Sequence, residues 1–564
     1  MSISINNSNQ VNHKQEGEIM NINQQSTPEE RNIVVSTENS THVENNLPQV
    51  CLPGNGVTLT ETAEAMATAY RNESNPEKRL YNRGGVACCI DKNPNGTLML
   101  TVLTAKRACS EFEQVAILGK QKKSKGGESV NSFEPDVCST DTASKILIAR
   151  SSLDILPRIN LVTSVPVILE GENNQCRVIN SYDEASGIFP TGIPVEDIPL
   201  TDAIQLLQEA ISDFNFQTEG DKSRGIAALL TPALVAGGVL DARAPVMMLE
   251  ADASQSGKGY FTKLLGAIYN ETPVTVTQRG GGTGSLDENF DAALCSGRQL
   301  IVLDNLRGKM NSPQIEAFLT SDLHMARMPY APQMAVEPKR YFIMATSNNF
   351  ELTVDMANRS NIIRILKRRT GYQFLSFAEG DILAHIKANQ PKYLGAIFAV
   401  IREWVSQGKP RQASARHDFR DWCRAMDWII QNIFHGVPLM EGHQDAKMMT
   451  MYPEANWIKG LFTVVNGLDE QNKPLTALDL AERCDLGELE LPGSQGFTLS
   501  DLDDKGRAQV CSQIGRRFSS LFKKLGNEGE INLGSFSLQR KSQKVTYASG
   551  KTENATFYLF NALA

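Results

Sequence analysis

The cysteines of this 564-residue chain form neither a metal-binding nor a disulfide pattern. There are ten, but they are scattered, no C-x2-C pair occurs, and only Cys88 and Cys89 are close together. This spacing argues against a zinc ribbon or a disulfide scaffold and favours a reducing compartment. No apolar run is long enough to span a bilayer, and the N-terminus lacks a signal-peptide pattern. We therefore expect a cytoplasmic protein without a membrane partner.

An excess of basic residues is also lacking, since the net charge of −8 does not favour a nucleic-acid partner. An apolar content of 41% and a charged content of 21% are typical of a soluble globular protein, and the length predicts two to four domains. Residues 1–50 contain ten Asn and five Gln without any period. Such a segment buries too little apolar surface to offset its ordering entropy, so we predict a disordered tail.

The most informative stretch is Pro245–Tyr260, PVMMLEADASQSGKGY. It reads as an apolar strand, a loop of small residues that contains Gly-Lys, and the start of a helix. This arrangement cradles phosphates, because backbone N–H groups and the helix N-terminus face the anion while the lysine reaches the terminal phosphates. The predicted nucleotide-binding residues are Ser254, Ser256, Gly257, Lys258, Gly259 and Tyr260.

The pattern G-x4-G-K-[ST] is nevertheless incomplete, because Asp252 and Gly259 replace a glycine and a hydroxyl residue. The missing hydroxyl removes the usual protein ligand to Mg²⁺, and Ser256, Thr262 or water would have to replace it. Taken alone, the loop leaves nucleotide binding open.

Three downstream segments supply the other parts of an ATPase site. In LIVLDN, a buried strand ends at Asp304, which we predict to hold Mg²⁺; Asn305 follows where many ATPases have a second acid. In FIMATSNN, Asn348 lies at a strand end and is predicted to orient the attacking water. In ANRSNIIRI, Arg359 is predicted to act as an arginine finger on a neighbouring subunit.

In this order, SQSGKG, LIVLDN, FIMATSNN and ANRSNIIRI resemble the AAA+ ATPase core of superfamily 3 helicases, in particular the helicase portion of primase-helicase proteins of phages, plasmids and other mobile elements. The resemblance covers roughly residues 246–366. It implies a hexameric ring, ATP hydrolysis between subunits, and a hairpin in the channel that grips single-stranded DNA. In this chain the hairpin falls within His324–Val336, with Arg327 and Tyr330 as its DNA contacts.

Basic residues are concentrated near the C-terminus, where Lys505 to Lys551 contain ten basic residues and two acids. A helical pattern over Gly506–Leu525 precedes strand patterns at Gly534–Leu538, Lys544–Tyr547 and Thr556–Phe560. Helices followed by a strand pair predict a winged helix that binds duplex DNA. Its predicted contacts are Arg516, Arg517, Lys523 and Lys524, although a solvated face or a protein-binding winged helix would have the same pattern.

The predicted fold is therefore α/β, with an AAA+ phosphate-loop core of a parallel sheet and flanking helices. The predicted segments are a disordered tail at 1–50, an α+β accessory domain at 51–195, the ATPase core with leading helices at 196–370, a helical region at 371–470 and a basic winged-helix-like domain at 471–564. We expect an ATP- and Mg²⁺-dependent helicase or translocase for mobile-element replication, whose partners are single- and double-stranded DNA, further copies in a ring, and a primase or polymerase.

An initiator or switch that binds ATP and DNA but hydrolyses little ATP is the alternative, because of Gly259 and Asn305. A small-molecule kinase is a third class, but no acceptor lid is recognisable in the sequence.

Overall fold

The sequence motifs lie in a five-stranded parallel sheet with the strand order β12-β13-β17-β11-β19. The computed structural model describes residues 47–122, 132–251, 256–277, 285–306, 309–310, 312–328, 332–348, 351–494, 497–525, 529–533, 536–546 and 552–563. The sheet consists of β11 (Val246–Ala251), β12 (Val274–Thr277), β13 (Leu300–Leu306), β17 (Phe342–Asn348) and β19 (Ser360–Ile365). The three motif strands of the sequence are thus neighbours, with β17 between β11 and β13.

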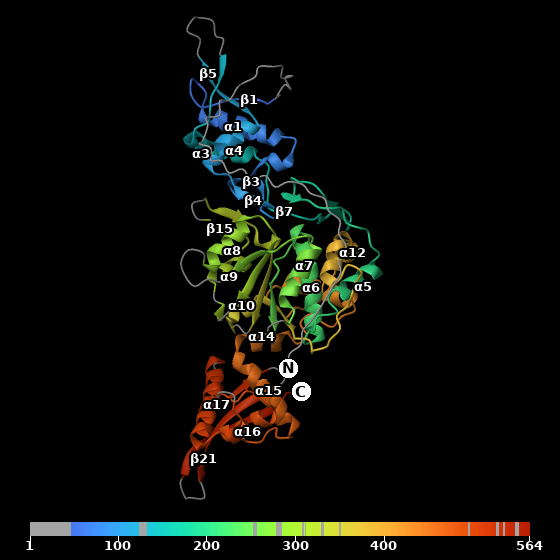
Figure 1. Ribbon diagram of the computed structural model, residues 1–564, viewed down its shortest axis with the longest axis vertical. Helices are drawn as coiled ribbons and strands as arrows, with labels where there is room; N and C mark the ends of the chain where they lie inside the picture. Colours follow the sequence, from blue (N-terminus) through green and yellow to red (C-terminus); the bar gives the residue numbers. More distant parts are fainter. Residues whose placement is uncertain are drawn as a thin grey trace, which may run out of the picture. The chain divides into compact units, whose positions relative to one another are not determined.

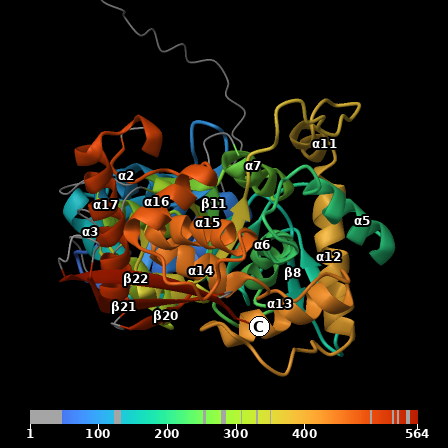
Figure 2. The ribbon, with the colours of Figure 1, turned by 90° about the horizontal axis from the view of Figure 1, so that it is seen from below.

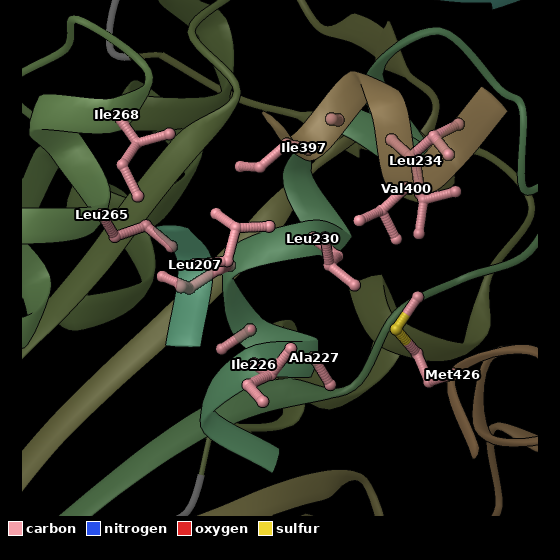
Figure 3. Close-up of a cluster of buried hydrophobic side chains, with 14 of the residues drawn as sticks. Leu207, Ile226, Ala227, Leu230, Leu234, Leu265, Ile268, Ile397, Val400 and Met426 are labelled. Carbon is pink, nitrogen blue, oxygen red and sulfur yellow. The ribbon is translucent and has the colours of Figure 1, made fainter. Parts of the chain in front are cut away.

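Both faces of this sheet are buried, which is why its strands read as continuous apolar runs. Met247 and Leu249 of β11 face one hydrophobic cluster, whereas Val246 and Met248 face another. The first cluster, part of which Figure 3 shows, includes helices α5 (Leu200–Ala210), α6 (Glu219–Ala236), α7 (Lys258–Ile268), α11 (Ile382–Ala388), α12 (Gln390–Ser406) and α13 (Arg420–Asn432). The second includes α8 (Leu286–Cys295), α9 (Pro313–Thr320) and α10 (Val354–Asn358).

The helices beyond residue 370 therefore share a core with the helices that precede β11. Leu207 of α5, Leu230 of α6 and Val400 of α12 lie in the same cluster, although almost two hundred residues separate the first from the last (Figure 3). Trp404 and Trp422 are fully buried in it. The predicted division at residue 370 stays a prediction. The hydrophobic core contains residues from both sides of that position.

A buried ion network connects the strand before the phosphate loop with helix α14 (His443–Met451). Glu250 of β11 accepts hydrogen bonds from Arg364 Nε at 2.9 Å and from Thr450 Oγ1 at 3.0 Å. Asp221 accepts one from Arg224 at 2.6 Å and one from the backbone N–H of Arg364 at 3.0 Å. All four charged side chains are buried, and each finds an opposite charge, as burial of charge requires.

Two buried histidines pack against the start of β19. His417 Nδ1 accepts from the N–H of Phe419 at 3.1 Å, and its Nε2 lies 3.1 Å from the carbonyl of Ser360. His443 Nε2 lies 3.3 Å from the backbone nitrogen of Ile362 and 3.2 Å from the carbonyl oxygen of Ser360. A ring nitrogen that accepts a hydrogen bond carries no proton, so the imidazole of His417 is neutral in this arrangement, and burial lowers the pKa of both histidines.

The N-terminal part is a mixed α/β module whose first helix begins with a capping box. Thr58 accepts from the N–H of Glu61 at 3.2 Å, and the Glu61 carboxylate accepts from the N–H of Thr58 at 2.7 Å. Its helices are α1 (Leu59–Asn72), α2 (Ala105–Glu111), α3 (Thr140–Ile148) and α4 (Arg150–Ile155). Its strands form two three-stranded sheets, one of β1 (Gln49–Cys51), β5 (Ile117–Lys122) and β6 (Ser132–Pro135), the other of β2 (Leu80–Arg83), β3 (Val86–Lys92) and β4 (Leu98–Val102).

Gln49 and Val50, which the sequence assigned to the tail, therefore belong to a strand, while residues 1–46 lie outside the described residues. Two small strand pairs link this module to α5. They are β7 (Leu161–Thr163) with β10 (Ile188–Pro190), and β8 (Val167–Glu170) with β9 (Cys176–Ile179).

The turn between β2 and β3 docks this module onto the sheet core. Arg83 is buried and donates to the carbonyls of Leu294 and Cys295 at the C-terminus of α8 and to the hydroxyl of Tyr341. A cation is favoured there by the helix dipole. Gly84 has a φ of +55°, and a Cβ atom there would lie 2.2 Å from the carbonyl oxygen of Ala335. Only glycine allows this approach, which brings the module against strand β16 (Met334–Val336).

The C-terminal part has its own core of three helices and a three-stranded antiparallel sheet (Figures 1 and 2). The elements are α15 (Pro453–Gly467), α16 (Ala477–Leu486), α17 (Asp504–Lys524), β20 (Glu530–Asn532), β21 (Phe536–Thr546) and β22 (Thr552–Ala562). The predicted separation of Gly534–Leu538 from Lys544–Tyr547 is wrong, because β21 pairs with β22 without a break from Phe536 to Thr546. None of the helices in the described ranges has the length and apolarity needed to cross a membrane.

Candidate nucleotide-binding and DNA-binding sites

Helix α7 begins directly after the loop that follows β11, and its N-terminus has the features of an anion site. Gly257 is the N-cap residue with a φ of +103°, and as a glycine it has no side chain that could cap the helix. Lys258 is the first helical residue, and Gly259 is exposed, with open space where the Cβ atom of another residue would lie. The N–H groups at a helix N-terminus favour a phosphate. Ser254 lies outside the described residues.

Two hydroxyls near this helix were predicted to compensate for the missing one. Ser256 Oγ is buried and has no hydrogen-bond partner among the described residues, which suits a ligand contact. Thr262 Oγ1 instead lies 3.2 Å from the carbonyl of Lys258 and 3.4 Å from the sulfur of Met344. Its hydroxyl is directed into the helix and sheet, so Ser256 is the better candidate of the two.

The carboxylate of Asp304 lies at the same edge of the sheet. Strands β11, β13 and β17 are parallel, and the register pairs Ala251 with Asn348. Asp304 is therefore two strands away from the phosphate loop, a separation of about 10 Å at the usual strand spacing. The side chain of Asp304 is exposed, and its Oδ1 accepts from Thr346 Oγ1 at 2.7 Å.

These residues fit a magnesium ion that is shared with a nucleotide. No three His, Cys, Asp or Glu side chains gather into a metal site anywhere in the described ranges. Mg²⁺ is commonly held by one or two carboxylates together with phosphate oxygens and water. Asp304 would supply the carboxylate, and a bound Mg²⁺ would neutralise charge on the phosphate oxygens.

A cavity of about 340 Å³ adjoins the N-terminus of α7. Phe214 packs against Phe261 with ring centroids 5.2 Å apart, and Arg368 stacks 4.1 Å from the ring centroid of Tyr372. Asp213 holds the segment of Tyr372 and Leu375 in place as one wall of the cavity, because it accepts hydrogen bonds from the hydroxyl of Tyr372 and from the N–H of Leu375. The lining residues are Asp213, Phe214, Ser256, Gly257, Tyr260, Arg368, Phe374, Leu375, Asp381 and Ile382.

This lining combines phosphate-loop residues with aromatic and aliphatic side chains, as a site for a nucleoside base requires. Tyr260 contributes to it in a neutral form, since burial and a hydrogen bond with Asp381 raise the pKa of its hydroxyl to about 12. This wall leaves no recognisable signal in the sequence, because its parts come from residues 213–214 and 368–382, far apart along the chain.

Arg359 lies at the opposite edge of the sheet from the phosphate loop. Its carbonyl accepts from the N–H of Val246, the first residue of β11, whereas the phosphate loop follows the last residue. Its Nη1 lies 3.6 Å from Glu316 Oε2 of α9, and both side chains are about one-fifth exposed. Thr353 Oγ1 donates to the other oxygen of Glu316 at 3.1 Å. Arg359 is therefore remote from Lys258 and Asp304 of its own chain.

The predicted hairpin is present as β15 (His324–Ala326) paired antiparallel with β16, and an aspartate fixes its base. Asp291 of α8 contacts His324 Nε2 at 2.9 Å and accepts from the N–H of Arg327 at 3.0 Å. The side chain of Arg327 is exposed. Tyr330 lies outside the described residues.

The four predicted DNA contacts of α17 differ in their surroundings. Arg517 forms a salt bridge with Glu490 at 3.0 Å and lies over the ring of Trp457, and Lys524 forms one with Glu454 at 3.0 Å. Arg516 and Lys523 are exposed. They belong to a stripe without acidic residues on the side of the helix away from its core, made of Lys505, Gln509, Ser512, Arg516, Ser519 and Lys523.

No protein-family model matches the chain, and no curated protein matches it. Among solved structures, the apo form of the NrS-1 C-terminal region aligns with a TM-score of 0.30 and 10% identity, over 85% of this chain and 95% of that chain. A structure titled "SCCmec type IV Cch - active helicase" aligns with a TM-score of 0.24 and 11% identity, over 87% of this chain and 98% of that chain. TM-scores this low establish neither a common fold nor a common activity.

Proposed function

We propose that this protein is an ATP- and Mg²⁺-dependent motor that translocates on or unwinds DNA during replication of a mobile element. The observation that carries the proposal is the common edge of the parallel sheet. The N-terminus of α7, the exposed carboxylate of Asp304 and an apolar cavity beside α7 all lie there. Topological switch points at the carboxyl ends of parallel strands are where open α/β sheets bind ligands.

In the proposed site, Lys258 and the backbone of residues 257–260 bind the β- and γ-phosphates, and the base enters the cavity beside Phe214. Asp304 holds Mg²⁺, Asn348 orients the attacking water, and Arg359 acts on the nucleotide of the next subunit in a ring. Single-stranded DNA contacts the hairpin at Arg327 and Tyr330, duplex DNA contacts α17 of a winged-helix-like domain, and a primase or polymerase acts beside the motor.

Binding of ATP to full-length protein, measured by calorimetry, tests this proposal. Lys258→Ala is expected to abolish binding, because a charge-assisted contact to the phosphates is lost. Lys263→Ala is the matched control, since Lys263 is an exposed lysine in the same helix, five residues further along. Equal ATP affinity for the wild-type protein and Lys258→Ala would refute the phosphate-loop site.

The second candidate is a DNA-binding switch that binds ATP but hydrolyses little of it, and the position after Asp304 favours it. Asn305 occupies a bulge of β13 with a φ of +51°, a conformation that asparagine tolerates better than glutamate does. A glutamate that polarises water is therefore disfavoured at this position by the backbone itself. An ATPase assay with and without single-stranded DNA separates the candidates, since a motor is stimulated by DNA and a switch shows no turnover.

A further inference from the structure

The end of β13 is irregular, and two adjacent hydroxyls of the neighbouring strand hold it. Leu303 pairs with Ala345 and Leu306 with Ser347, so β13 contains one residue more than β17 between these pairs. The extra residue forms a bulge at Asp304 and Asn305, and bulges redirect side chains at functional sites. Ser347 Oγ donates to the carbonyl of Leu306 at 3.0 Å, on the far side of the bulge.

Thr346 contacts the bulge at the carboxylate itself. Its Oγ1 accepts from the N–H of Asn305 at 2.9 Å and donates to Asp304 Oδ1 at 2.7 Å. Thr346 is buried, and a β-branched side chain in a strand has few rotamers. The exposed carboxylate is thereby held in one orientation by a hydroxyl that is itself fixed.

We propose that Thr346 is the positioning residue of the metal carboxylate, and this inference rests on the proposed function. Its hydroxyl occupies one oxygen of Asp304 and sets the direction of the carboxylate toward the phosphate edge of the sheet. Partners of this kind are worth a factor of about 10–100 in metal affinity in other proteins. Thr346 is not among the residues that line the base cavity, so its effect is expected on the metal and not on the base.

The adjacent residues provide matched variants. Thr346→Val keeps the shape and removes the hydroxyl, whereas Thr346→Ser keeps the hydroxyl. Ser347→Ala removes a hydroxyl from the same bulge but leaves Asp304 untouched. Thr346→Ala removes the hydroxyl in a second way, so the test does not depend on the folding of the valine variant alone.

The experiment titrates Mn²⁺ into full-length protein with a non-hydrolysable ATP analogue and follows free Mn²⁺ by electron paramagnetic resonance. Removing the Thr346 hydroxyl is expected to raise the half-saturating Mn²⁺ concentration about tenfold. Thr346→Ser and Ser347→Ala are expected to stay within about twofold of wild type. Affinity for the analogue in EDTA is expected to be the same in every variant.

A folded Thr346→Val or Thr346→Ala variant that binds Mn²⁺ as wild type does would overturn the inference, as would an equal loss in Ser347→Ala. In both cases the proposed function stands if Asp304→Ala raises the Mn²⁺ requirement. Failure of the proposed function has a different signature. Lys258→Ala and Asp304→Ala would then leave analogue and Mn²⁺ binding unchanged.

Discussion

Arg359→Ala is the change that best separates a ring motor from a protein that works as a monomer. Strand β11 begins at Val246 and ends at Ala251. Arg359 lies beside Val246, whereas the phosphate loop follows Ala251. Six residues at about 3.3 Å each put nearly 20 Å between Arg359 and its own phosphate loop. An arginine side chain covers less than half of that distance, so any catalytic contact has to be made to another subunit.

The expected effect on turnover is large. Arginine fingers contribute about 10³–10⁵ in rate, which corresponds to about 4–7 kcal/mol of activation free energy. Arg359→Ala should therefore bind ATP normally and lose nearly all hydrolysis. Glu316→Gln is the control for a purely structural role, because it removes the charge that Arg359 faces at 3.6 Å and leaves the arginine in place. If the ion pair were what matters, both variants would lose activity.

Mixing two inactive variants supplies the decisive assay. In a ring assembled from equal amounts of Arg359→Ala and Lys258→Ala, about one-quarter of the interfaces combine an intact Lys258 with an intact Arg359. A steady-state ATPase assay should therefore recover up to about one-quarter of the wild-type rate from two inactive proteins. Activity no greater than the sum of the separate variants, or a monomer by light scattering with ATP present, would refute the proposed action on a neighbouring subunit.

Two further predictions concern other parts of the chain. The double change Arg516→Ala and Lys523→Ala should weaken duplex DNA binding and reduce the log–log salt slope by about 2, since each phosphate contact adds about 0.9. Titrations over a range of salt concentrations that give the wild-type affinity and slope would contradict this. The control is Arg517→Ala with Lys524→Ala, which should change the slope less because these cations already face Glu490 and Glu454. Burial lowers the pKa of His417 to about 4 and lowers the pKa of His443 as well. Between about pH 6.5 and pH 4 the unfolded chain therefore binds protons that the folded chain does not. As the pH is lowered through this range, the free energy of unfolding should decrease by about 1.4 kcal/mol per pH unit for each histidine. Urea unfolding from pH 7.5 to 5 should therefore show a smaller loss for His417→Gln than for wild type, and equal losses would contradict it.

Features that depend on residues close together in the sequence were predictable, whereas features that depend on residues far apart in the sequence were not. The apolar runs that become β11, β13 and β17 were predictable, because strands buried on both faces leave a continuous apolar signal along the chain. The polar residues near the ends of these strands, Lys258, Asp304 and Asn348, were predictable for the same local reason. The hairpin over 324–336 is local as well.

The order of the strands was decided only by the tertiary structure, because a strand's hydrogen-bonded neighbours leave no mark on its own periodicity. That order puts β17 between β11 and β13, and so brings the hydroxyl of Thr346 to Asp304 across 42 residues. It also brings residues 213–214 to the segment after β19 to form the cavity beside α7.

The same limit applies to the basic residues of the C-terminal part. Basic residues can be counted from the sequence, but whether a cation is already neutralised depends on which acid the fold brings to it. Arg517 meets Glu490 and Lys524 meets Glu454, a residue 70 positions away, whereas Arg516 and Lys523 form no salt bridge with another described residue. Sequence determines which side chains carry charge and where local elements begin, and tertiary packing decides which of those charges remain available, because ion pairs depend on distance in space.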